Sequence, residues 1–386
     1  MRVALVTTHP VQYQVPWIRR LATQPGIDLH VYYAMVPDAR QQGAGFGVQF
    51  SWDLPLLEGY SHSVLRNVAA QPSVIHFRGC DTPQIFSEIR KGSWDAVIVN
   101  GWGVKSTVQA ALAARWAGVP CLVRGEVNGL RPRRWAIHLA HAALFRLYAG
   151  FLAIGSANRD YYRAHGVPAR KIFWTPYGVD NGFFRMDAAS AAEARRALRA
   201  RHHIPDDAVC LLFCGKFEHK KRPLQLIEAF TRLRPSVLQA PVHLLMVGDG
   251  ELRARCEQAA AGHAVHFAGF LNQREIVAAY AATDLLVLPS DAGETWGLVV
   301  NEAMAAGLPT VVSDHVGCHA DLVTARETGA VFALDDVSGL AATLETLAGD
   351  PARLRAMGDR ARQRVHDFSI DAVVAGCLQG LQAVCR

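Results

Sequence analysis

Short apolar runs alternate with helix-like periodicity along most of this chain. The runs that predict buried strands in the first half are 3–8, 28–33, 95–100, 120–125, 150–155 and 171–176. The pattern restarts in the second half, with runs at 208–217, 242–250, 264–270, 284–290 and 309–314. Continuous apolar strands that alternate with helices are typical of parallel sheets covered by helices on both faces. Because the pattern restarts, and because 386 residues exceed one ordinary core, the sequence predicts two such domains.

The boundary between the domains is expected at the segment "TPYGVDNGFF" (175–184), because the stretch 186–207 that follows is polar and helical. The chain ends in two predicted helices that join near Phe368. The expected parts are a first domain at 1–180, a second domain at 181–367 and a C-terminal helix at 368–386. Ligands of open parallel sheets bind at the carboxyl ends of the strands. Two such domains that face each other would therefore place their motifs along a cleft.

Charge and composition narrow the class of protein. Hydrophobic residues make up 51% of the chain and charged residues 19%, as in soluble globular enzymes. The net charge of +6 is spread along the chain, with no run of five like charges. Nucleic-acid readers cluster their basic residues on one element, so we expect no nucleic-acid partner. A mild positive balance fits anionic small ligands or an anionic membrane surface better.

The eight cysteines include no CxxC pair and no zinc-like grouping. Several lie in apolar runs, where a reduced cysteine acts as a small hydrophobe, so we expect a reducing compartment. The N-terminal "MRVALVTTHP" reads as a first strand rather than a signal peptide. The longest apolar stretch, which starts at 135, is interrupted by His138, His141 and Arg146, so it predicts no transmembrane helix. These features together predict a cytoplasmic protein.

A basic cluster follows the first strand of the second half. Gly215 ends the predicted strand, and Lys216, Lys220, Lys221 and Arg222 follow just before a predicted helix at about 222–234. A helix N-terminus with nearby cations is typical of an anion site. A solvated basic loop is an equally open interpretation. The Walker pattern GxxxxGK[ST] is absent.

The segment "SDAGETWGLVVNEAMAAGLPT" (290–310) combines an apolar helix with two carboxylates. A helix that is apolar all round is buried, and an ionised carboxylate is costly to bury without a partner. Glu294 and Glu302 are eight residues apart, about 12 Å along a helix, which is comparable to a pyrophosphate with a sugar at each end. The two acids could bind sugar hydroxyls. The alternatives are an acid favoured at a helix start for Glu294 and a structural ion pair for Glu302.

The stretch "ETWGLVVNE" resembles the E-x7-E motif of the family-4 retaining glycosyltransferases. The resemblance extends over the second half through "CGKFEHKKRPLQLIEAF", "LLMVGDGELR" and "VHFAGF". It implies the GT-B fold, in which two doubly wound, Rossmann-like α/β domains face each other across a cleft. The first domain would then lie on the acceptor side, the second would bind a nucleotide sugar, and the C-terminal helix would pack back on the first.

The resemblance also implies a set of donor-binding residues, namely Gly215, Lys216, Lys221, Gly269, Phe270, Glu294, Gly297, Leu298 and Glu302. Lys216 and Lys221 would grip the diphosphate, and the backbone at 269–270 would read the base. Glu302 would bind the ribose and Glu294 the transferred sugar. The family usually has Arg where Lys216 stands, and a lysine offers a point charge rather than a bidentate fork.

The first half resembles the family less strongly. "TPYGVDNGFF" matches its interdomain P-x-G-V-D segment, but "VTTHPVQYQVPWIRRLA" replaces a glycine pair after the first strand. Glu126 falls where many members carry a histidine, so we take it as the catalytic candidate from this half, alongside Lys216, Lys221 and Glu294 from the other. The acceptor-side candidates are His9, Gln12, Tyr13 and Arg124. For His9, a turn residue at the end of a strand is the alternative.

The activity that the resemblance implies is transfer of a sugar, with retention, from a UDP- or GDP-type nucleotide sugar. The acceptor would be a saccharide or lipid-linked saccharide in the assembly of a cell-surface polysaccharide such as lipopolysaccharide. Because no DxD motif is present, we expect metal independence and no cofactor beyond the nucleotide-sugar co-substrate. A nucleotide-sugar epimerase of GT-B shape and a non-catalytic nucleotide-sugar-binding protein are the alternatives.

The stretch "RPRRWAIHLAHAALFRLYAG" (131–150) carries basic and apolar residues on one helix. Such a helix suits an interfacial contact with anionic lipid, which would make the protein peripheral at the inner face of the plasma membrane. A normally packed helix with one charged end is the alternative.

Overall fold

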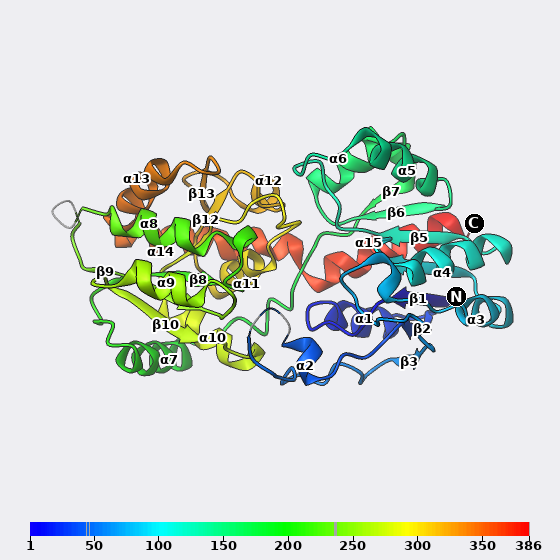
Figure 1. The fold of residues 1–386 in the computed structure, drawn as a ribbon, viewed down its shortest axis with the longest axis horizontal. Helices are drawn as coiled ribbons and strands as arrows, with labels where there is room; N and C mark the ends of the chain where they lie inside the picture. The colour runs from blue at the N-terminus through cyan, green and yellow to red at the C-terminus, as the bar shows by residue number, and fades with distance from the viewer. Residues whose placement is uncertain (44, 46, 235–237, 386) are drawn as a thin grey trace. The chain divides into compact units, whose positions relative to one another are not determined.

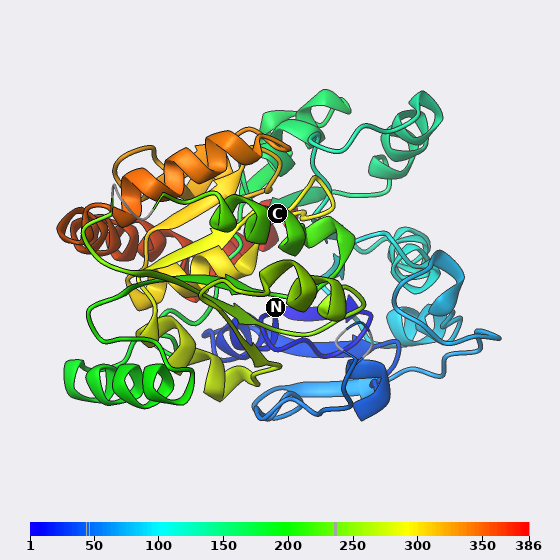
Figure 2. The ribbon, with the colours of Figure 1, turned by 60° about the vertical axis from the view of Figure 1, so that its left-hand side comes forward.

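The computed structural model describes residues 1–43, 45, 47–234 and 238–385. Its strands form two parallel sheets, one of seven strands and one of six, with helices on both faces (Figures 1 and 2). The two predicted parallel-sheet α/β domains are thereby confirmed. The chain divides into two compact units. The first unit holds 1–37, 54–179 and 369–386, and the second holds 38–53 and 180–368.

The first sheet has the strand order β3-β2-β1-β4-β5-β6-β7. Its strands are β1 (Arg2–Thr7), β2 (Asp28–Tyr33), β3 (Ser61–Val64), β4 (Ala96–Asn100), β5 (Cys121–Arg124), β6 (Gly150–Ala153) and β7 (Ile172–Trp174). The helices are α1 (Val15–Ala22), α3 (Ile85–Lys91), α4 (Lys105–Trp116), α5 (Trp135–Phe145), α6 (Ser156–Ala164) and α15 (Ile370–Val384). The strand order reverses between β1 and β4, which makes their carboxyl ends a topological switch point.

The C-terminal helix α15 belongs to the first unit and packs against α1, β6 and β7. Its apolar face joins the core beneath the sheet, where Val373, Cys377 and Leu381 are fully buried. Gly376 allows the close approach, because a Cβ at this position would lie 1.9 Å from the carbonyl oxygen of Trp174. The last residues of the described chain are therefore part of the core that supports the first sheet.

The second sheet has the strand order β10-β9-β8-β11-β12-β13. Its strands are β8 (Val209–Cys214), β9 (Val242–Val247), β10 (Val265–Gly269), β11 (Leu285–Leu288), β12 (Thr310–Ser313) and β13 (Gly329–Phe332). The helices of this unit are α2 (Ala39–Gln42), α7 (Ala188–Arg201), α8 (Pro223–Thr231), α9 (Arg253–Ala260), α10 (Gln273–Ala282), α11 (Leu298–Ala306), α12 (His319–Leu322), α13 (Val337–Ala348) and α14 (Pro351–Val365). The order reverses between β8 and β11, so the loops after these two strands meet at a second switch point.

The compact units differ from the expected domain division at one segment. Residues 38–53 lie between β2 and β3 in the sequence, but they pack with the second unit. The segment is tied to the start of α10, where the backbone N–H of Arg274 donates to the Asp53 carboxylate over 3.0 Å. A domain division drawn along the chain cannot anticipate such an excursion, because the contacts that decide it are more than 200 residues away.

No helix within the described part of the chain is long and apolar enough to cross a membrane. All eight cysteines carry free thiols in the structure. Six of them, including Cys121, Cys210 and Cys377, are buried. Burial raises the pKa of the Cys210 and Cys377 thiols to about 12 and that of Cys121 well above its ordinary value, so they behave as small apolar groups rather than reactive thiolates.

Candidate active site

Lys221 and Glu294 form an ion pair at the switch point of the second sheet. Lys221 follows β8, Glu294 follows β11, and the lysine Nζ donates to Glu294 Oε2. The two side chains are only 13% and 14% exposed. Burial alone would lower the pKa of Lys221, but the Glu294 carboxylate raises it above its ordinary value. Burial likewise opposes ionisation of Glu294, yet Lys221 and then Lys220 hold its pKa below the usual range.

Glu302 is held differently. The Tyr280 hydroxyl, on α10, donates to Glu302 Oε2 over 2.6 Å. No arginine or lysine forms an ion pair with Glu302 in the part of the chain that the structure describes. Loss of hydration raises the pKa of Glu302 to about 7, although the Tyr280 hydrogen bond and Lys221 act in the opposite direction. Glu302 is therefore poised near neutral pH, unlike Glu294.

The other members of the basic cluster are in two environments: Lys220 and Arg222 form ion pairs at the surface, and Lys216 is partly buried. Lys220 pairs with Glu218 at 3.4 Å, and Arg222 pairs with Asp335 at 2.7 Å. Lys216 is partly buried, and burial, followed by the positive charges of Lys220 and Lys221, lowers its pKa against the pull of Glu218. The cluster is therefore more than a solvated loop, because Lys221 is enclosed and its charge is matched by an acid.

Glycines bring the loops of this site close together. A Cβ on Gly248, after β9, would lie 2.0 Å from the carbonyl oxygen of Gly215, which follows β8. The N-cap of α11 is Gly297, with φ of 101°. This residue has no side chain that could accept from the first-turn amides at Leu298 and Val299. Such amides and the positive end of the helix dipole favour an anion.

Two further donor candidates lie at the far strand of the same edge. β10 ends at Gly269, whose φ is 74°, and Phe270 follows directly. The ring of Phe270 lies 4.2 Å from the ring of Phe50, at an angle of 31°. Thus the nine donor candidates all lie in the second unit, at the end of β10, in loops that follow its strands or on the helix after β11.

The candidates of the first half gather at the carboxyl ends of β1 and β5 in the first unit. The Tyr177 hydroxyl donates to Glu126 Oε1 over 2.5 Å. The Arg124 guanidinium carbon lies 4.5 Å from the Tyr177 ring centre and 5.4 Å from that of Trp17. Arg124 is 3% exposed, and among the described residues its buried Nε has no hydrogen-bond partner. Glu126 and Arg124 are therefore bound into one aromatic cluster.

His9, Gln12 and Tyr13 lie in the loop between β1 and α1. His9 Nδ1 is 2.9 Å from the Thr8 hydroxyl, and burial lowers the pKa of His9 to about 4. Its imidazole is therefore neutral near pH 7. Tyr13 joins the same cluster as Glu126, since its ring centre lies 6.0 Å from that of Tyr177.

Two tyrosines that hold candidate acids, Tyr177 and Tyr280, could not be predicted from the sequence. Tyr177 lies within the quoted segment 175–184, but its target, Glu126, is 51 positions away. Tyr280 is 22 positions from Glu302, in another helix. No spacing rule relates these pairs, since each arises only when separate elements pack together.

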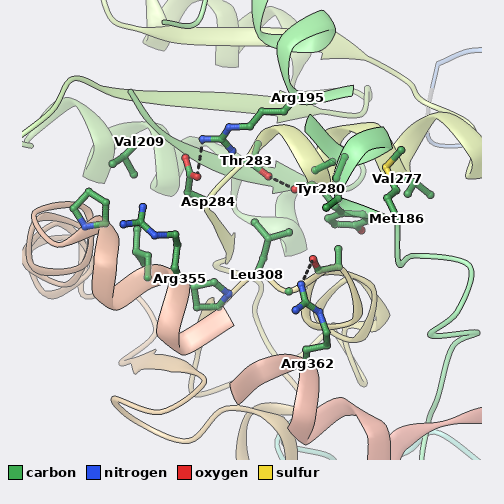
Figure 3. A pocket seen from close by; sticks show the side chains of 18 of the residues that line it. Met186, Arg195, Val209, Val277, Tyr280, Thr283, Asp284, Leu308, Arg355 and Arg362 are labelled. Carbon is green, nitrogen blue, oxygen red and sulfur yellow. Dashed lines mark hydrogen bonds and ion pairs between the residues drawn. The ribbon is translucent and has the colours of Figure 1, made fainter. Parts of the chain in front are cut away.

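A cavity of about 740 Å³ lies at the opposite edge of the second sheet, near the amino ends of β8, β11 and β12 (Figure 3). Arg195 and Asp284, paired at 2.9 Å, stand on one side of it, and Arg362 stands on another. None of the donor candidates lines this cavity. Tyr280 connects the two edges, because its ring lines the cavity while its hydroxyl reaches Glu302.

No group of three or more His, Cys, Asp or Glu side chains is arranged to hold a metal ion within residues 1–43, 45, 47–234 and 238–385. The positive charge at the switch point of the second sheet comes from lysine side chains.

The known proteins that this chain resembles are glycosyltransferases. Residues 194–364 match the family described as "Glycosyl transferases group 1". The chain is 30% identical over 302 residues to a D-inositol 3-phosphate glycosyltransferase of Kineococcus radiotolerans, covering 66% of this chain and 68% of that protein. It is also 30% identical over 260 residues to a GDP-mannose-dependent alpha-(1-6)-phosphatidylinositol dimannoside mannosyltransferase of Mycobacterium tuberculosis.

That second match covers 66% of this chain and 64% of the mannosyltransferase, so the chain spans slightly less than two thirds of its length. Among solved structures, HepE of Anabaena in complex with UDP superposes with a TM-score of 0.75. The two sequences are 17% identical, and the superposition covers 99% of this chain and 100% of HepE. This likeness shows the fold, which is that of the GT-B transferases.

Proposed function

Since this chain belongs to the group 1 glycosyl transferases, we propose that it moves a sugar from a nucleoside-diphosphate sugar to a saccharide or lipid-linked saccharide acceptor. The single observation that carries the proposal is the Lys221–Glu294 pair beside Glu302 at the switch point of the second sheet. Cations, a helix N-terminus and two acids at one edge of a parallel sheet suit a ligand that combines a diphosphate with sugar hydroxyls. The relatives that match are transferases by name, which leaves the epimerase alternative without support.

In this proposal the second unit binds the donor. Lys216 and Lys221 contact the diphosphate, together with the amides that begin α11, while Glu302 accepts hydrogen bonds from the ribose. The backbone at 269–270 contacts the base. UDP and GDP are the candidate nucleotides, because one relative is named for GDP-mannose and a structural neighbour holds UDP.

The chemical step that we propose is departure of the nucleoside diphosphate with retention at the anomeric carbon. Negative charge grows on the diphosphate as the bond to the sugar breaks, and preorganised cations and amides stabilise that charge without reorganisation. Glu294, held by Lys221, orients the transferred sugar. Glu126 is the catalytic group that we propose from the first unit. Its carboxylate is positioned by the Tyr177 hydroxyl.

The acceptor belongs to the first unit in this proposal, where His9, Gln12, Tyr13 and Arg124 lie near its switch point. The relatives named above act on phosphatidylinositol dimannoside and on inositol 3-phosphate, so the saccharide acceptor of this chain is sought among phosphorylated or lipid-linked molecules. We place the reaction in cell-surface polysaccharide assembly, in the cytoplasm.

A direct test is release of nucleotide from candidate donors. Purified protein is incubated with UDP-glucose or GDP-mannose, with and without extracted membrane lipid, and free UDP or GDP is measured. The proposal predicts release that increases with an acceptor and falls by at least about a hundredfold in Lys221→Met, the scale found when one electrostatic donor is removed. Nucleotide binding without any turnover would instead support a non-catalytic nucleotide-sugar-binding protein.

We propose metal independence because lysines supply the positive charge at the diphosphate site. Activity is expected to be unchanged, within a factor of about two, after treatment with EDTA and exchange into metal-free buffer. Loss of activity that added Mg²⁺ or Mn²⁺ restores would contradict the proposal. The anomeric configuration of the product, read by proton NMR at the earliest time points, tests retention in the same reaction mixture.

A peripheral contact with anionic membrane is also proposed, with α5 as its site. Trp135 and Leu139 on this helix are 75% and 60% exposed, and Arg131 and Arg134 just before it are exposed as well. Phe145 at its other end is buried, so only the first part of the helix offers an apolar surface. Flotation with vesicles rich in phosphatidylglycerol should enrich the protein, less so after Trp135→Ser. Absence of enrichment for the unmodified protein would refute the contact.

A further inference from the structure

Residues 38–53, which we call the strap, belong to the second unit, although the residues directly before and after them in the sequence belong to the first. The strap has internal order. Asp38 and Gln41 form a capping box at α2, and the Phe50 N–H donates to the Ala39 carbonyl over 3.2 Å. Gly43 sits against the carbonyl of Val48, which a Cβ at position 43 would approach to 1.7 Å. The described residues at the two ends of the strap are therefore bonded to each other.

The strap is fastened to the N-terminus of α10 by side chains of both partners. Asn272, the N-cap of α10, donates from Nδ2 to the Ser51 carbonyl over 2.9 Å. The Asp53 carboxylate accepts from the Arg274 N–H over 3.0 Å. An acid at a helix N-terminus is favoured by the helix dipole. These bonds fix the end of the strap within four residues of Phe270.

The fastened end brings Phe50 against Phe270. The two ring centres are 4.2 Å apart and the ring planes are tilted by 31°. Trp52 stands edge-on to Phe50, with ring centres 4.9 Å apart. Phe50, which comes from outside the second half of the sequence, thus adds an aromatic ring beside Phe270.

The strap also approaches the phosphate end of the proposed donor site. A Cβ built on Gly45 would lie 2.9 Å from Lys216 Nζ. The strap therefore runs from the proposed diphosphate cation to the proposed base-reading segment, which are the two ends of a nucleotide. A nucleobase offers a π-face at one of these ends, and stacking on aromatic side chains is sequence-tolerant but strong.

We propose that the strap completes the base end of the donor site and that Phe50 is a donor-binding residue, because the nucleobase of the donor stacks on the Phe50–Phe270 pair. This inference rests on the proposed function. It adds Phe50 to the donor site. Phe50 lies before β3 in the sequence, outside the second half that contains the other donor-site residues.

The test is calorimetric titration of UDP, GDP and inorganic pyrophosphate into the full chain, its Phe50→Ala and Phe50→Tyr variants and a matched control. Val48→Ala is the control, because Val48 lies in the same strap and is 38% exposed. Loss of one base–aromatic stack corresponds to roughly 5- to 150-fold in affinity. We expect Phe50→Ala to weaken the preferred nucleotide by at least about fivefold, with pyrophosphate affinity unchanged. Phe50→Tyr and Val48→Ala should bind as the unmodified protein does.

Three results would overturn the inference. Unchanged nucleotide affinity in Phe50→Ala would remove Phe50 from the site, and tighter binding would make the strap a competitor of the base rather than its support. An equal loss of pyrophosphate affinity would point to general damage. Each of these leaves the proposed function standing as long as Glu302→Ala weakens nucleotide binding. If the unmodified protein binds neither UDP nor GDP, the proposed function fails together with the inference.

Discussion

At the scale of single residues, the two acids of the E-x7-E segment are in different electrostatic states. Glu294 is ionised and matched by Lys221, whereas Glu302 has a pKa of about 7 and is held by a neutral hydroxyl. A ribose offers hydroxyl donors, and a carboxylate accepts them best when it is ionised. Donor binding should therefore favour the charged form of Glu302.

This difference predicts that nucleotide affinity rises with pH. Between pH 6 and pH 8 Glu302 passes from mostly protonated to mostly ionised, so UDP or GDP should bind more tightly at pH 8, by about tenfold at most. Calorimetric titration at both pH values measures the change. Glu302→Gln, which keeps a hydrogen-bond acceptor for Tyr280 but cannot ionise, should flatten the profile. A profile equally steep in Glu302→Gln would assign the pH dependence to another group.

The same raised pKa predicts how stability depends on pH. A carboxyl whose pKa is raised on folding binds more protons in the folded state, so its effect on stability becomes less favourable as pH rises from about 4.5 toward 7. Glu302→Gln should therefore gain stability relative to the unmodified protein at pH 8 but not at pH 4, by roughly 1–3 kcal/mol. Urea unfolding at the two pH values measures this difference. A constant difference between the two proteins would contradict the assignment.

The buried Lys221–Glu294 pair allows structure and chemistry to be separated. Lys221→Met leaves an uncompensated carboxylate in a site that is 14% exposed, which should cost about 2–4 kcal/mol of stability. The double variant Lys221→Met/Glu294→Gln should recover most of that loss, because no unpaired charge remains. Transfer activity should be absent in both variants. Recovery of activity in the double variant would show that the pair serves folding alone.

At the scale of elements, most strands could be predicted because they are continuous apolar runs buried on both faces. β1 is an example, since Val3 to Val6 are fully buried. β3 was not predicted, because Ser61–Val64 is a short edge strand whose side chains are mostly exposed. The packing of the strap on the second unit could not be predicted either, since the sequence of 38–53 gives no sign of the contact between Phe50 and Phe270.

The tight packing of α15 on β7 gives a prediction at this scale. The Cβ of Gly376→Ala would lie only 1.9 Å from the carbonyl oxygen of Trp174. The helix must therefore shift or the strand must bend. We expect a loss of roughly 2–4 kcal/mol in the free energy of unfolding, as for other forced overpacking. The neighbouring Ala375 is exposed, and Ala375→Ser should change stability by less than about 0.5 kcal/mol. Equal effects of both changes would mean that α15 is not packed as described.

At the scale of the whole molecule, the two-sheet architecture and the second-half motifs could be predicted from the sequence. The partners that hold the candidate acids could not, because Tyr177 and Tyr280 reach Glu126 and Glu302 through tertiary packing. In the first half, residue spacing indicates least about Arg124 and Glu126, since Glu126 stands where many members of the family carry a histidine. Their role follows from the cluster that surrounds them rather than from a motif.

We propose above that Lys221, Glu294 and Glu302 form the donor site of a glycosyltransferase. The most direct measurement is calorimetric titration of the purified chain with UDP and with GDP at pH 8, repeated on Glu302→Ala. We expect one nucleotide to bind clearly more tightly than the other. Glu302→Ala should weaken its binding by at least about tenfold, which corresponds to the loss of one hydrogen-bonded charged group, with the melting temperature preserved. Equal affinity in the variant, or no binding of either nucleotide, would contradict the assignment of the donor site to these three residues.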